Sequence, residues 1–187
     1  MGTENSLKVV FLDRDGVINI NHGHVGTIDR FDFIDGSIDA MVRIRKAGYE
    51  IIVVTNQAGI AKGYYSLNDY HKLTGYMRVR LSGSSIEILS VYFCPHHPDG
   101  SVVDLSVVCG CRKPAPGMFI KASNDYDLDL GRSFIIGDKY TDIAAGQAAG
   151  VGNFGYVGEE VHVPQALAGL NIINEKCLLA CVIKMGF

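Results

Sequence analysis

The sequence predicts an α/β fold in which a doubly wound, parallel sheet of Rossmann-like type carries helices on both faces. Short apolar runs alternate along the chain with amphipathic stretches, which is the pattern of such a sheet. The apolar runs are nearly continuous, as strands buried on two faces require. With 187 residues the chain fits one domain, which we expect to span residues 1–187.

The first part of the chain predicts a strand, a helix and a second strand. Residues 8–12 (KVVFL) and 50–55 (EIIVVT) are the two apolar runs. Between them, residues 37–47 carry apolar side chains at helical spacing, and Gly48 stands where a helix C-cap is expected. This order predicts a βαβ unit.

A second helix and a third strand are expected next. Ser66 is followed three residues later by Asp69, which resembles a capping box. Behind it, residues 67–81 keep their apolar side chains at helical spacing, so we expect the helix there. The apolar run at residues 86–93 predicts the third strand.

The last part of the chain predicts two further strands and three further segments that cover the sheet. Proline is favoured in the first turn of a helix, so a helix is expected from about Pro116 to residue 126. Residues 133–137 and 151–156 predict strands, and the alanine-rich residues 141–149 predict the helix between them. The apolar tail at 177–185 is too short to span a bilayer and is expected to dock on the core.

Composition and charge argue against several classes of partner. A net charge of −3, with 17 Lys and Arg against 20 Asp and Glu, leaves no basic stripe for nucleic acid. No apolar run reaches about 18 residues, and the opening MGTENSLK lacks the pattern of a signal peptide. We therefore expect a cytoplasmic monomer with neither a nucleic-acid nor a membrane partner.

Polar residues gather where the predicted strands end, which is where open α/β sheets bind ligands. After the first strand, Asp13 and Asp15 point the same way because strand side chains repeat every two residues. Gly16 then allows the chain to turn sharply away. Other polar residues expected at the same edge are Thr55, Asn56, Gln57, Lys113, Asp138, Lys139 and Asp142.

Each of these groups alone has a purely structural interpretation. The two acids suit a solvated turn, Thr55 suits a helix N-cap, and the pair Arg112 and Lys113 suits an exposed face. Together they suit phosphoryl transfer through an aspartyl phosphate, with one carboxylate as nucleophile and a second as proton donor. Mg²⁺ would be held by hard oxygen ligands. No glycine-rich phosphate loop is present, which argues against a nucleotide-dependent kinase or ATPase.

The motifs DRDG at 13–16, TN at 55–56, Lys113 and GDKYTD at 137–142 resemble the four motifs of the haloacid dehalogenase superfamily. This resemblance implies a magnesium-dependent phosphoric monoester hydrolase. It makes Asp13 the nucleophile and Asp15 the general acid and base, with Thr55 and Lys113 binding the transferring phosphoryl group. The implied magnesium ligands are Asp13, the carbonyl of Asp15, and Asp138. The intervals between the motifs leave no room for a cap domain.

A second set of residues predicts a metal-binding loop. Cys94, His96, Cys109 and Cys111 form a C-x-H and C-x-C pair separated by residues 97–108, and all are zinc ligand types. Four side-chain ligands would close a structural site. Buried free thiols or a Cys109/Cys111 redox pair are the alternatives, and His97 stands beside His96 as a second imidazole. Two further cysteines, Cys177 and Cys181, are expected to be core thiols.

The zinc loop resembles that of the histidinol-phosphate phosphatase-like subfamily, and only this resemblance selects His96 over His97 as the zinc ligand. The length of the interval 97–108 favours members that act on a sugar bisphosphate. A small phosphorylated sugar is therefore the implied substrate, and histidinol phosphate is the alternative. The implied substrate contacts are Asn21, His22, Gly23, His24, Asn56, Gln57, Ala58, Arg112 and Lys139.

Two non-enzymatic functions compete with this interpretation. A receiver-type phosphoacceptor module is also doubly wound and clusters Asp, Thr and Lys, but its phosphoaccepting aspartate follows the third strand. Here the candidate nucleophile, Asp13, follows the first predicted strand. A zinc-ribbon interaction module is the other competitor, and release of phosphate with Mg²⁺ distinguishes an enzyme from both.

Overall fold

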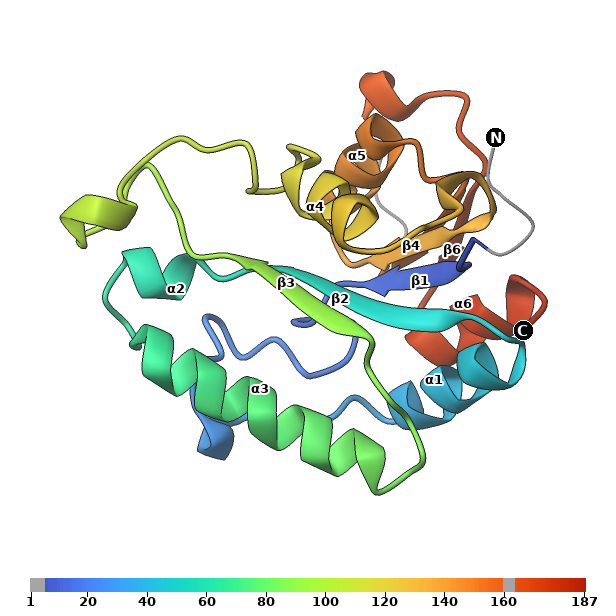
Figure 1. The fold of residues 1–187 in the computed structure, drawn as a ribbon, viewed down its shortest axis with the longest axis horizontal. Coiled ribbons are helices and arrows are strands. Elements are labelled where there is room, and N and C mark those ends of the chain that lie inside the picture. The colour runs from blue at the N-terminus through green and yellow to red at the C-terminus, as the bar shows by residue number, and fades with distance from the viewer. Residues whose placement is uncertain (1–5, 160–163) are drawn as a thin grey trace.

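The computed structural model describes residues 6–159 and 164–187, and their strands form one parallel sheet in the order β3-β2-β1-β4-β5-β6 (Figure 1). The predicted α/β fold is thus confirmed. The expectation that residues 1–5 carry no leader sequence falls outside the described residues. The strands are β1 Val9–Leu12, β2 Glu50–Asn56, β3 Ser90–Cys94, β4 Phe134–Gly137, β5 Asn153–Val157 and β6 Ile172–Glu175.

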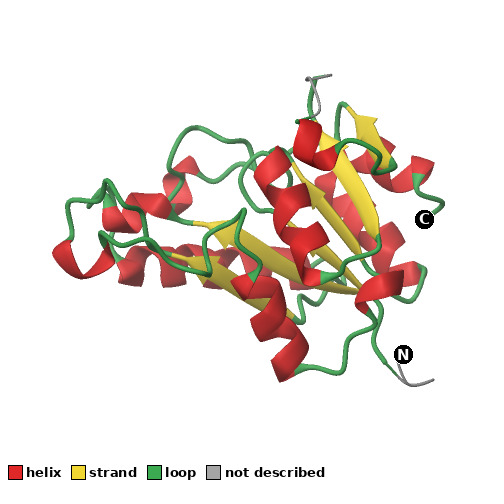
Figure 2. Ribbon diagram, turned by 90° about the horizontal axis from the view of Figure 1, so that it is seen from above, coloured by secondary structure: helices red, strands yellow, loops and turns green. Residues whose placement is uncertain are grey.

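Helices cover the sheet on both faces (Figures 1 and 2). In Figure 1, α4 and α5 lie above the sheet, whereas α1, α3 and α6 lie below it. The α-helices are α1 Ser37–Lys46, α2 Ala58–Ala61, α3 Leu67–Ser82, α4 Gly117–Asp125, α5 Tyr140–Ala149 and α6 Leu178–Lys184. Within the described ranges, no helix is both long and apolar enough to cross a bilayer.

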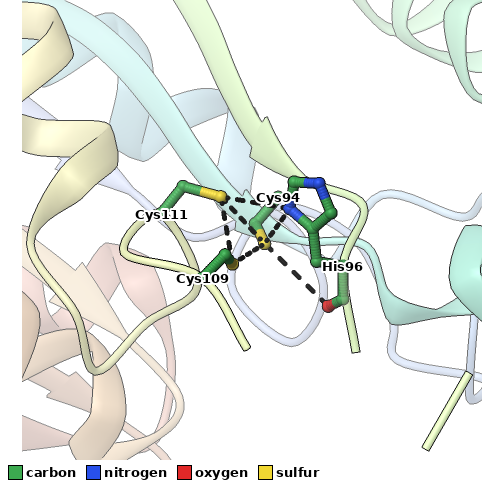
Figure 3. A group of neighbouring side chains, drawn as sticks. All are labelled: Cys94, His96, Cys109 and Cys111. Atoms are coloured by element: carbon green, nitrogen blue, oxygen red, sulfur yellow. Dashed lines mark hydrogen bonds between the residues drawn. The ribbon is translucent and has the colours of Figure 1, made fainter. Parts of the chain in front are cut away.

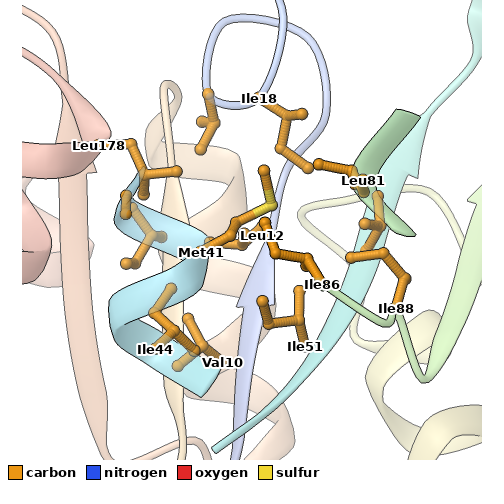
Figure 4. Close-up of a cluster of buried hydrophobic side chains, with 14 of the residues drawn as sticks. Val10, Leu12, Ile18, Met41, Ile44, Ile51, Leu81, Ile86, Ile88 and Leu178 are labelled. Atoms are coloured by element: carbon orange, nitrogen blue, oxygen red, sulfur yellow. The ribbon is translucent and has the colours of Figure 1, made fainter. Parts of the chain in front are cut away.

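Alternation along the central strand divides the core into two layers. Val10 and Leu12 of β1 face the α1, α3 and α6 side, where Figure 4 shows Met41 and Leu178 packed around them. Val9 and Phe11 face the α4 and α5 side, and the Phe11 ring lies 4.8 Å from that of Phe119. Every residue of β1 is fully buried, which explains its unbroken apolar run.

The local signals for helix ends hold in the structure. Ser66 and Asp69 form the predicted capping box at the start of α3: each side chain accepts a hydrogen bond from the other residue's backbone N–H. Gly48 follows α1 with a left-handed φ of 81°. The helix expected near Pro116 begins at Gly117, with Pro116 as its N-cap.

Element boundaries differ most from the sequence prediction at the third and fifth strands. The third strand begins at Ser90 rather than at residue 86, although Ile86 and Ile88 are already buried in the core. The fifth strand spans 153–157 rather than 151–156. Strand β6 and the short helix α2 were not expected, because β6 is a half-buried edge strand of four residues and α2 is a single turn.

Candidate active site

The strand order reverses between β1 and β4, and polar side chains gather at the carboxyl end of this junction. After β2 and β3 have been laid on one side of β1, the chain crosses to the other side to form β4, β5 and β6. A reversal of this kind leaves a crevice at the carboxyl ends of the strands. Asp13 follows β1, and its N–H donates to the carbonyl of Ile136 in β4 at 3.0 Å. Asp138 follows β4 directly.

Gly16 allows the loop after β1 to pass close to Asp138. Its φ is 91°, in the left-handed region, and any Cβ at this position would overlap the Asp138 carboxylate. The glycine of the DRDG motif is therefore needed both for its backbone conformation and for the space it leaves.

A buried lysine lies at the centre of the acids. The Lys113 ammonium is 3.1 Å from Asp13 Oδ1 and 2.5 Å from Asp142 Oδ1, and it donates to the Val54 carbonyl at 2.7 Å. Burial acts to lower the pKa of Lys113, but the two carboxylates outweigh it and raise that pKa above its ordinary value. Lys113 is therefore charged and held on three sides.

The backbone of Lys113 is fixed by Asn56, one of the predicted substrate contacts. The Asn56 amide accepts from the Lys113 N–H at 3.1 Å and donates to the Lys113 carbonyl at 3.0 Å. The asparagine after β2 thus ties the segment that follows the zinc loop to the end of the sheet.

Three carboxylates, those of Asp13, Asp138 and Asp142, each offer an oxygen within 4.8 Å of the others. Burial raises the pKa of Asp138 to about 7, and the nearby Asp13 adds to the effect. Asp138 Oδ1 is buried and makes no hydrogen bond within the described part of the chain; the Lys139 ammonium is 3.7 Å away. This oxygen is available to a cation.

Asp15 is held by a network of donors rather than by another acid. Arg14 places Nη2 3.0 Å from both carboxylate oxygens, and Asn19 donates to Oδ1 at 3.0 Å. The Gln57 amide donates to Asp15 Oδ2 at 3.0 Å and to the hydroxyl of fully buried Thr55 at 2.8 Å. The side chain of Arg14 is itself buried and also donates to the Val25 carbonyl.

These groups surround a pocket of about 390 Å³. Most predicted site residues line it, but Thr55, Gln57 and Asp138 do not. His22 also does not line it, because its imidazole pairs with Asp32 at 2.9 Å on the exposed loop. The residues that line it are Asp13, Asp15, Asn21, Gly23, His24, Asn56, Ala58, Tyr65, Arg112, Lys113, Lys139, Thr141 and Asp142.

Tyr65 and Thr141 also line this pocket, although the sequence does not predict either of them as a site residue. The sequence predicts Asp142 only as a further acid at this edge, and its ion pair with Lys113 explains its burial. Its spacing, one helical turn after Asp138, was the signal for it. No local pattern marks Tyr65, which lies between α2 and α3.

The predicted zinc ligands form one cluster beside β3 (Figure 3). Sulfur–sulfur distances among Cys94, Cys109 and Cys111 are 3.2–3.5 Å, and His96 Nδ1 lies 3.4 Å from Cys111 and 3.6 Å from Cys94. Ligand atoms on one tetrahedral zinc ion would lie about 3.8 Å apart, so this spacing suits the ion. The three cysteines are free of disulfides.

Geometry also distinguishes the two neighbouring histidines. His96 points its ring into the cluster, whereas His97 Nδ1 accepts a hydrogen bond from the Asp99 N–H at 3.1 Å. The cluster lies next to the pocket, because Arg112 follows Cys111 and donates through Nη1 to the His96 carbonyl at 3.4 Å. Cys177 and Cys181 lie away from this cluster, at the start of and within α6.

Comparison with known proteins points to phosphatases. A family model described as HAD-hydrolase-like (haloacid dehalogenase-like) matches residues 110–169. A D-glycero-beta-D-manno-heptose-1,7-bisphosphate 7-phosphatase of Yersinia pestis is 45% identical over 147 residues, covering 79% of this chain and 78% of that protein. One of the same description from Photorhabdus laumondii is 42% identical over 180 residues, covering 95% and 96%.

Solved structures agree with these relatives. A HAD-like phosphatase from Mesorhizobium loti superposes with a TM-score of 0.83 at 30% identity, covering 100% of this chain and 91% of the other. A D,D-heptose 1,7-bisphosphate phosphatase from B. bronchiseptica, in complex with magnesium and phosphate, gives a TM-score of 0.79 at 27% identity. That match covers 96% of this chain and 98% of the other.

Proposed function

The chain belongs to the haloacid dehalogenase-like hydrolases, in the family of the D-glycero-D-manno-heptose-1,7-bisphosphate 7-phosphatases, and from this premise we propose its reaction. It hydrolyses the 7-phosphate of D-glycero-D-manno-heptose 1,7-bisphosphate, leaves the 1-phosphate in place, and passes through an aspartyl phosphate. From its similarity to these phosphatases, we also infer that the product is a heptose precursor of bacterial lipopolysaccharide.

The observation that carries this proposal is the meeting of Asp13, Asp15 and Lys113 in one pocket at the switch point of the sheet. A carboxylate nucleophile needs a neighbouring cation where negative charge develops and a second acid for the leaving group. Lys113 lies 3.1 Å from Asp13 and is buried, so its charge is little screened by solvent.

We assign the steps as follows. A carboxylate oxygen of Asp13 attacks phosphorus while the bond to the sugar oxygen breaks, and Asp15 delivers a proton to that oxygen. Asp15 then removes a proton from a water molecule, which attacks the aspartyl phosphate and releases inorganic phosphate. Lys113 stabilises the phosphoryl group in both steps. The resemblance gives Thr55 the same role, but its fully buried hydroxyl does not line the pocket, so we assign the main contact to Lys113.

The acid cluster fits a magnesium ion. Asp138 Oδ1 is buried without a hydrogen bond, and the pKa of Asp138 is raised to about 7 because burial and Asp13 oppose its charge. A divalent cation relieves both problems, and carboxylate and carbonyl oxygens are the ligands Mg²⁺ prefers. Asp13, Asp138 and the Asp15 carbonyl would hold the ion. When bound, it neutralises charge on the phosphoryl oxygens.

The cysteine cluster fits a structural zinc ion. Cys94, His96, Cys109 and Cys111 would fill all four positions, leaving none for a catalytic water. The metal would fix the loop that leads into Arg112 and Lys113 and so support the pocket indirectly. Reduced thiols are the norm in the cytoplasm, where we place the protein, as a monomer.

Charges at the pocket rim suit the second phosphate of the substrate. Only one phosphate can lie against Asp13, so the other end of the sugar needs a cation further out. Arg112 lines the pocket, and its guanidinium matches phosphate oxygens. Lys139, Asn21, Gly23 and His24 line the same opening, and we assign them to the sugar and its distal phosphate.

A substrate panel tests the proposal. Phosphate release is measured with both anomers of the heptose bisphosphate and with histidinol phosphate, with and without Mg²⁺. The proposal predicts Mg²⁺-dependent release, with kcat/KM highest for a heptose bisphosphate. Preference for histidinol phosphate would reassign the substrate, and no release from any member would refute the enzymatic function.

A further inference from the structure

We propose that Tyr65 is a positioning residue that fixes the side-chain amide of Gln57 and, through it, the carboxylate of Asp15. This inference rests on the proposed function, in which Asp15 protonates the leaving group. It assigns Gln57 to the support of Asp15 rather than to substrate, and it gives a role to a tyrosine that no sequence motif had marked.

The Gln57 side chain makes every hydrogen bond that an amide can make. Its oxygen accepts from Tyr65 Oη at 2.6 Å and from Arg14 Nη2 at 3.2 Å. Its nitrogen donates to Asp15 Oδ2 at 3.0 Å and to Thr55 Oγ1 at 2.8 Å. Because two acceptors and two donors are all satisfied, the buried amide has one favoured orientation.

The partners determine which way this amide faces. A guanidinium can only donate, so Arg14 requires the Gln57 oxygen on its side. Asp15 Oδ2 accepts a hydrogen bond from the Gln57 amide, so the nitrogen of that amide lies on the Asp15 side. Tyr65 must then donate its hydroxyl proton, since it faces the oxygen. The tyrosine thereby helps to hold the amide donor on Asp15.

The ring of Tyr65 is itself held in place by two glycines from other segments. A Cβ on Gly26 would overlap one edge of the ring, and a Cβ on Gly59 would overlap the edge that carries the hydroxyl. Both backbones therefore pack directly on the ring. Burial raises the pKa of Tyr65 above its ordinary value, so the hydroxyl keeps its proton throughout the working range.

A positioning role for Asp15 has a kinetic signature that a general structural role lacks. An alkoxide leaving from a sugar phosphate needs a proton in the transition state, whereas an activated aryl oxide departs without one. The ratio kcat/KM reports the steps up to departure of the leaving group. Loss of Asp15 alignment therefore lowers kcat/KM for the sugar phosphate selectively.

The test compares Tyr65→Phe with Tyr92→Phe. Tyr65 is 8% exposed and Tyr92 is 7% exposed, and the Tyr92 hydroxyl donates to Asp125 at 2.8 Å, away from the pocket. Tyr65→Phe should lower kcat/KM for the heptose bisphosphate about 10-fold, as for one buried hydrogen bond, and for p-nitrophenyl phosphate less than about twofold. Tyr92→Phe should leave kcat/KM unchanged for both substrates.

A second variant tests the same role without removing the hydroxyl. Gly59 lies in α2, where alanine is a favourable helix residue. In Gly59→Ala, however, the alanine methyl would overlap the Tyr65 ring and displace it. We expect the same selective loss in Gly59→Ala, with folding of every variant checked by circular dichroism and thermal unfolding. Equal losses on both substrates in Tyr65→Phe, or no loss on either, would overturn the proposal.

Asp15→Asn separates failure of this inference from failure of the proposed function. If Asp15→Asn shows the leaving-group-selective loss and Tyr65→Phe does not, the positioning role falls and the proposed function stands. If Asp15→Asn affects both substrates equally, Asp15 is not the proton donor, and both assignments fall.

Discussion

Replacing Lys113 by methionine removes the cation around which the buried acids are arranged while keeping much of the side chain's volume. The ammonium lies 3.1 Å from Asp13 and 2.5 Å from Asp142, and all three side chains are almost fully buried. In Lys113→Met the two carboxylates face each other and Asp138 with no buried cation between them. Removing one partner of a buried ion pair is among the most destabilising single changes.

The size of the effect follows from this burial. Loss of one partner from a buried pair costs about 3–5 kcal/mol in the free energy of unfolding. For a chain of this length each kcal/mol shifts Tm by about 2–4 °C, so Lys113→Met should lower Tm by roughly 6–20 °C at pH 8. Lys139→Met is the matched control. The Lys139 side chain is 57% exposed and its ammonium lies 3.7 Å from Asp138 Oδ1, so its loss should cost less than about 1 kcal/mol.

The loss of stability in Lys113→Met should also depend on pH. The pKa of Lys113 is raised in the folded protein. The contribution of Lys113 to the free energy of unfolding is therefore fully present at pH 8, and it is lost only as the pH rises through this raised pKa. Burial already raises the pKa of Asp142, and loss of the cation raises it further. The folded variant then binds more protons than the unfolded chain, so lowering the pH from 8 toward 5.5 should recover part of the stability.

Urea unfolding at pH 8 and pH 5.5, without added Mg²⁺, measures these differences in wild type, Lys113→Met and Lys139→Met. A Lys113→Met protein as stable at pH 8 as Lys139→Met would show that Lys113 does not balance buried carboxylates. A deficit independent of pH would show that the loss comes from packing rather than from charge.

Three further predictions concern the rim, the cysteine cluster and the acid cluster. Arg112→Ala should lose about 10- to 150-fold in kcat/KM on the bisphosphate, the cost of a charged hydrogen bond, but little on a small monophosphate that does not reach the rim. Equal losses on both would place Arg112 at the transferring group. Cys109→Ser should lack zinc by elemental analysis and lose stability and activity together, whereas Cys177→Ser should retain all three; a zinc-free Cys109→Ser with full activity would contradict the structural role. Because the pKa of Asp138 is about 7, protons should compete with Mg²⁺, and calorimetry should show affinity falling up to about tenfold for each pH unit below 7. The same raised pKa means that stability without Mg²⁺ should fall as pH rises from about 4 to 7, and an Mg²⁺ affinity that is flat with pH would count against the assignment.

Much of the fold and the placement of polar side chains at the strand ends could be predicted from the sequence because these signals are local. Side chains that repeat every two residues place Asp13 and Asp15 on the same side of the chain, and the buried strands are apolar throughout. Strand β6 escaped prediction because its residues, Ile172–Glu175, are half-buried at a sheet edge and carry too few apolar side chains. Whether the edge is paired depends on β5, which lies elsewhere in the sequence.

The parts of the site that could not be predicted are contacts between distant segments. The sequence suggested substrate contacts for Asn56 and Gln57, yet the structure engages the Asn56 amide with the Lys113 backbone and the Gln57 amide with Asp15 and Tyr65. A motif shows that an amide is present at the end of a strand. The partner of that amide depends on how loops far apart in the chain fold over the strand ends.

The central claim is that Asp13 removes the 7-phosphate of a heptose 1,7-bisphosphate, and phosphorus NMR of the reaction tests it most directly. Wild-type protein with Mg²⁺ should convert the 7-phosphate signal to inorganic phosphate and leave the 1-phosphate signal intact. Asp13→Asn should fold normally and release none, because an amide cannot form the acyl phosphate. Mg²⁺-dependent turnover in Asp13→Asn, or loss of the 1-phosphate first in wild type, would contradict the account.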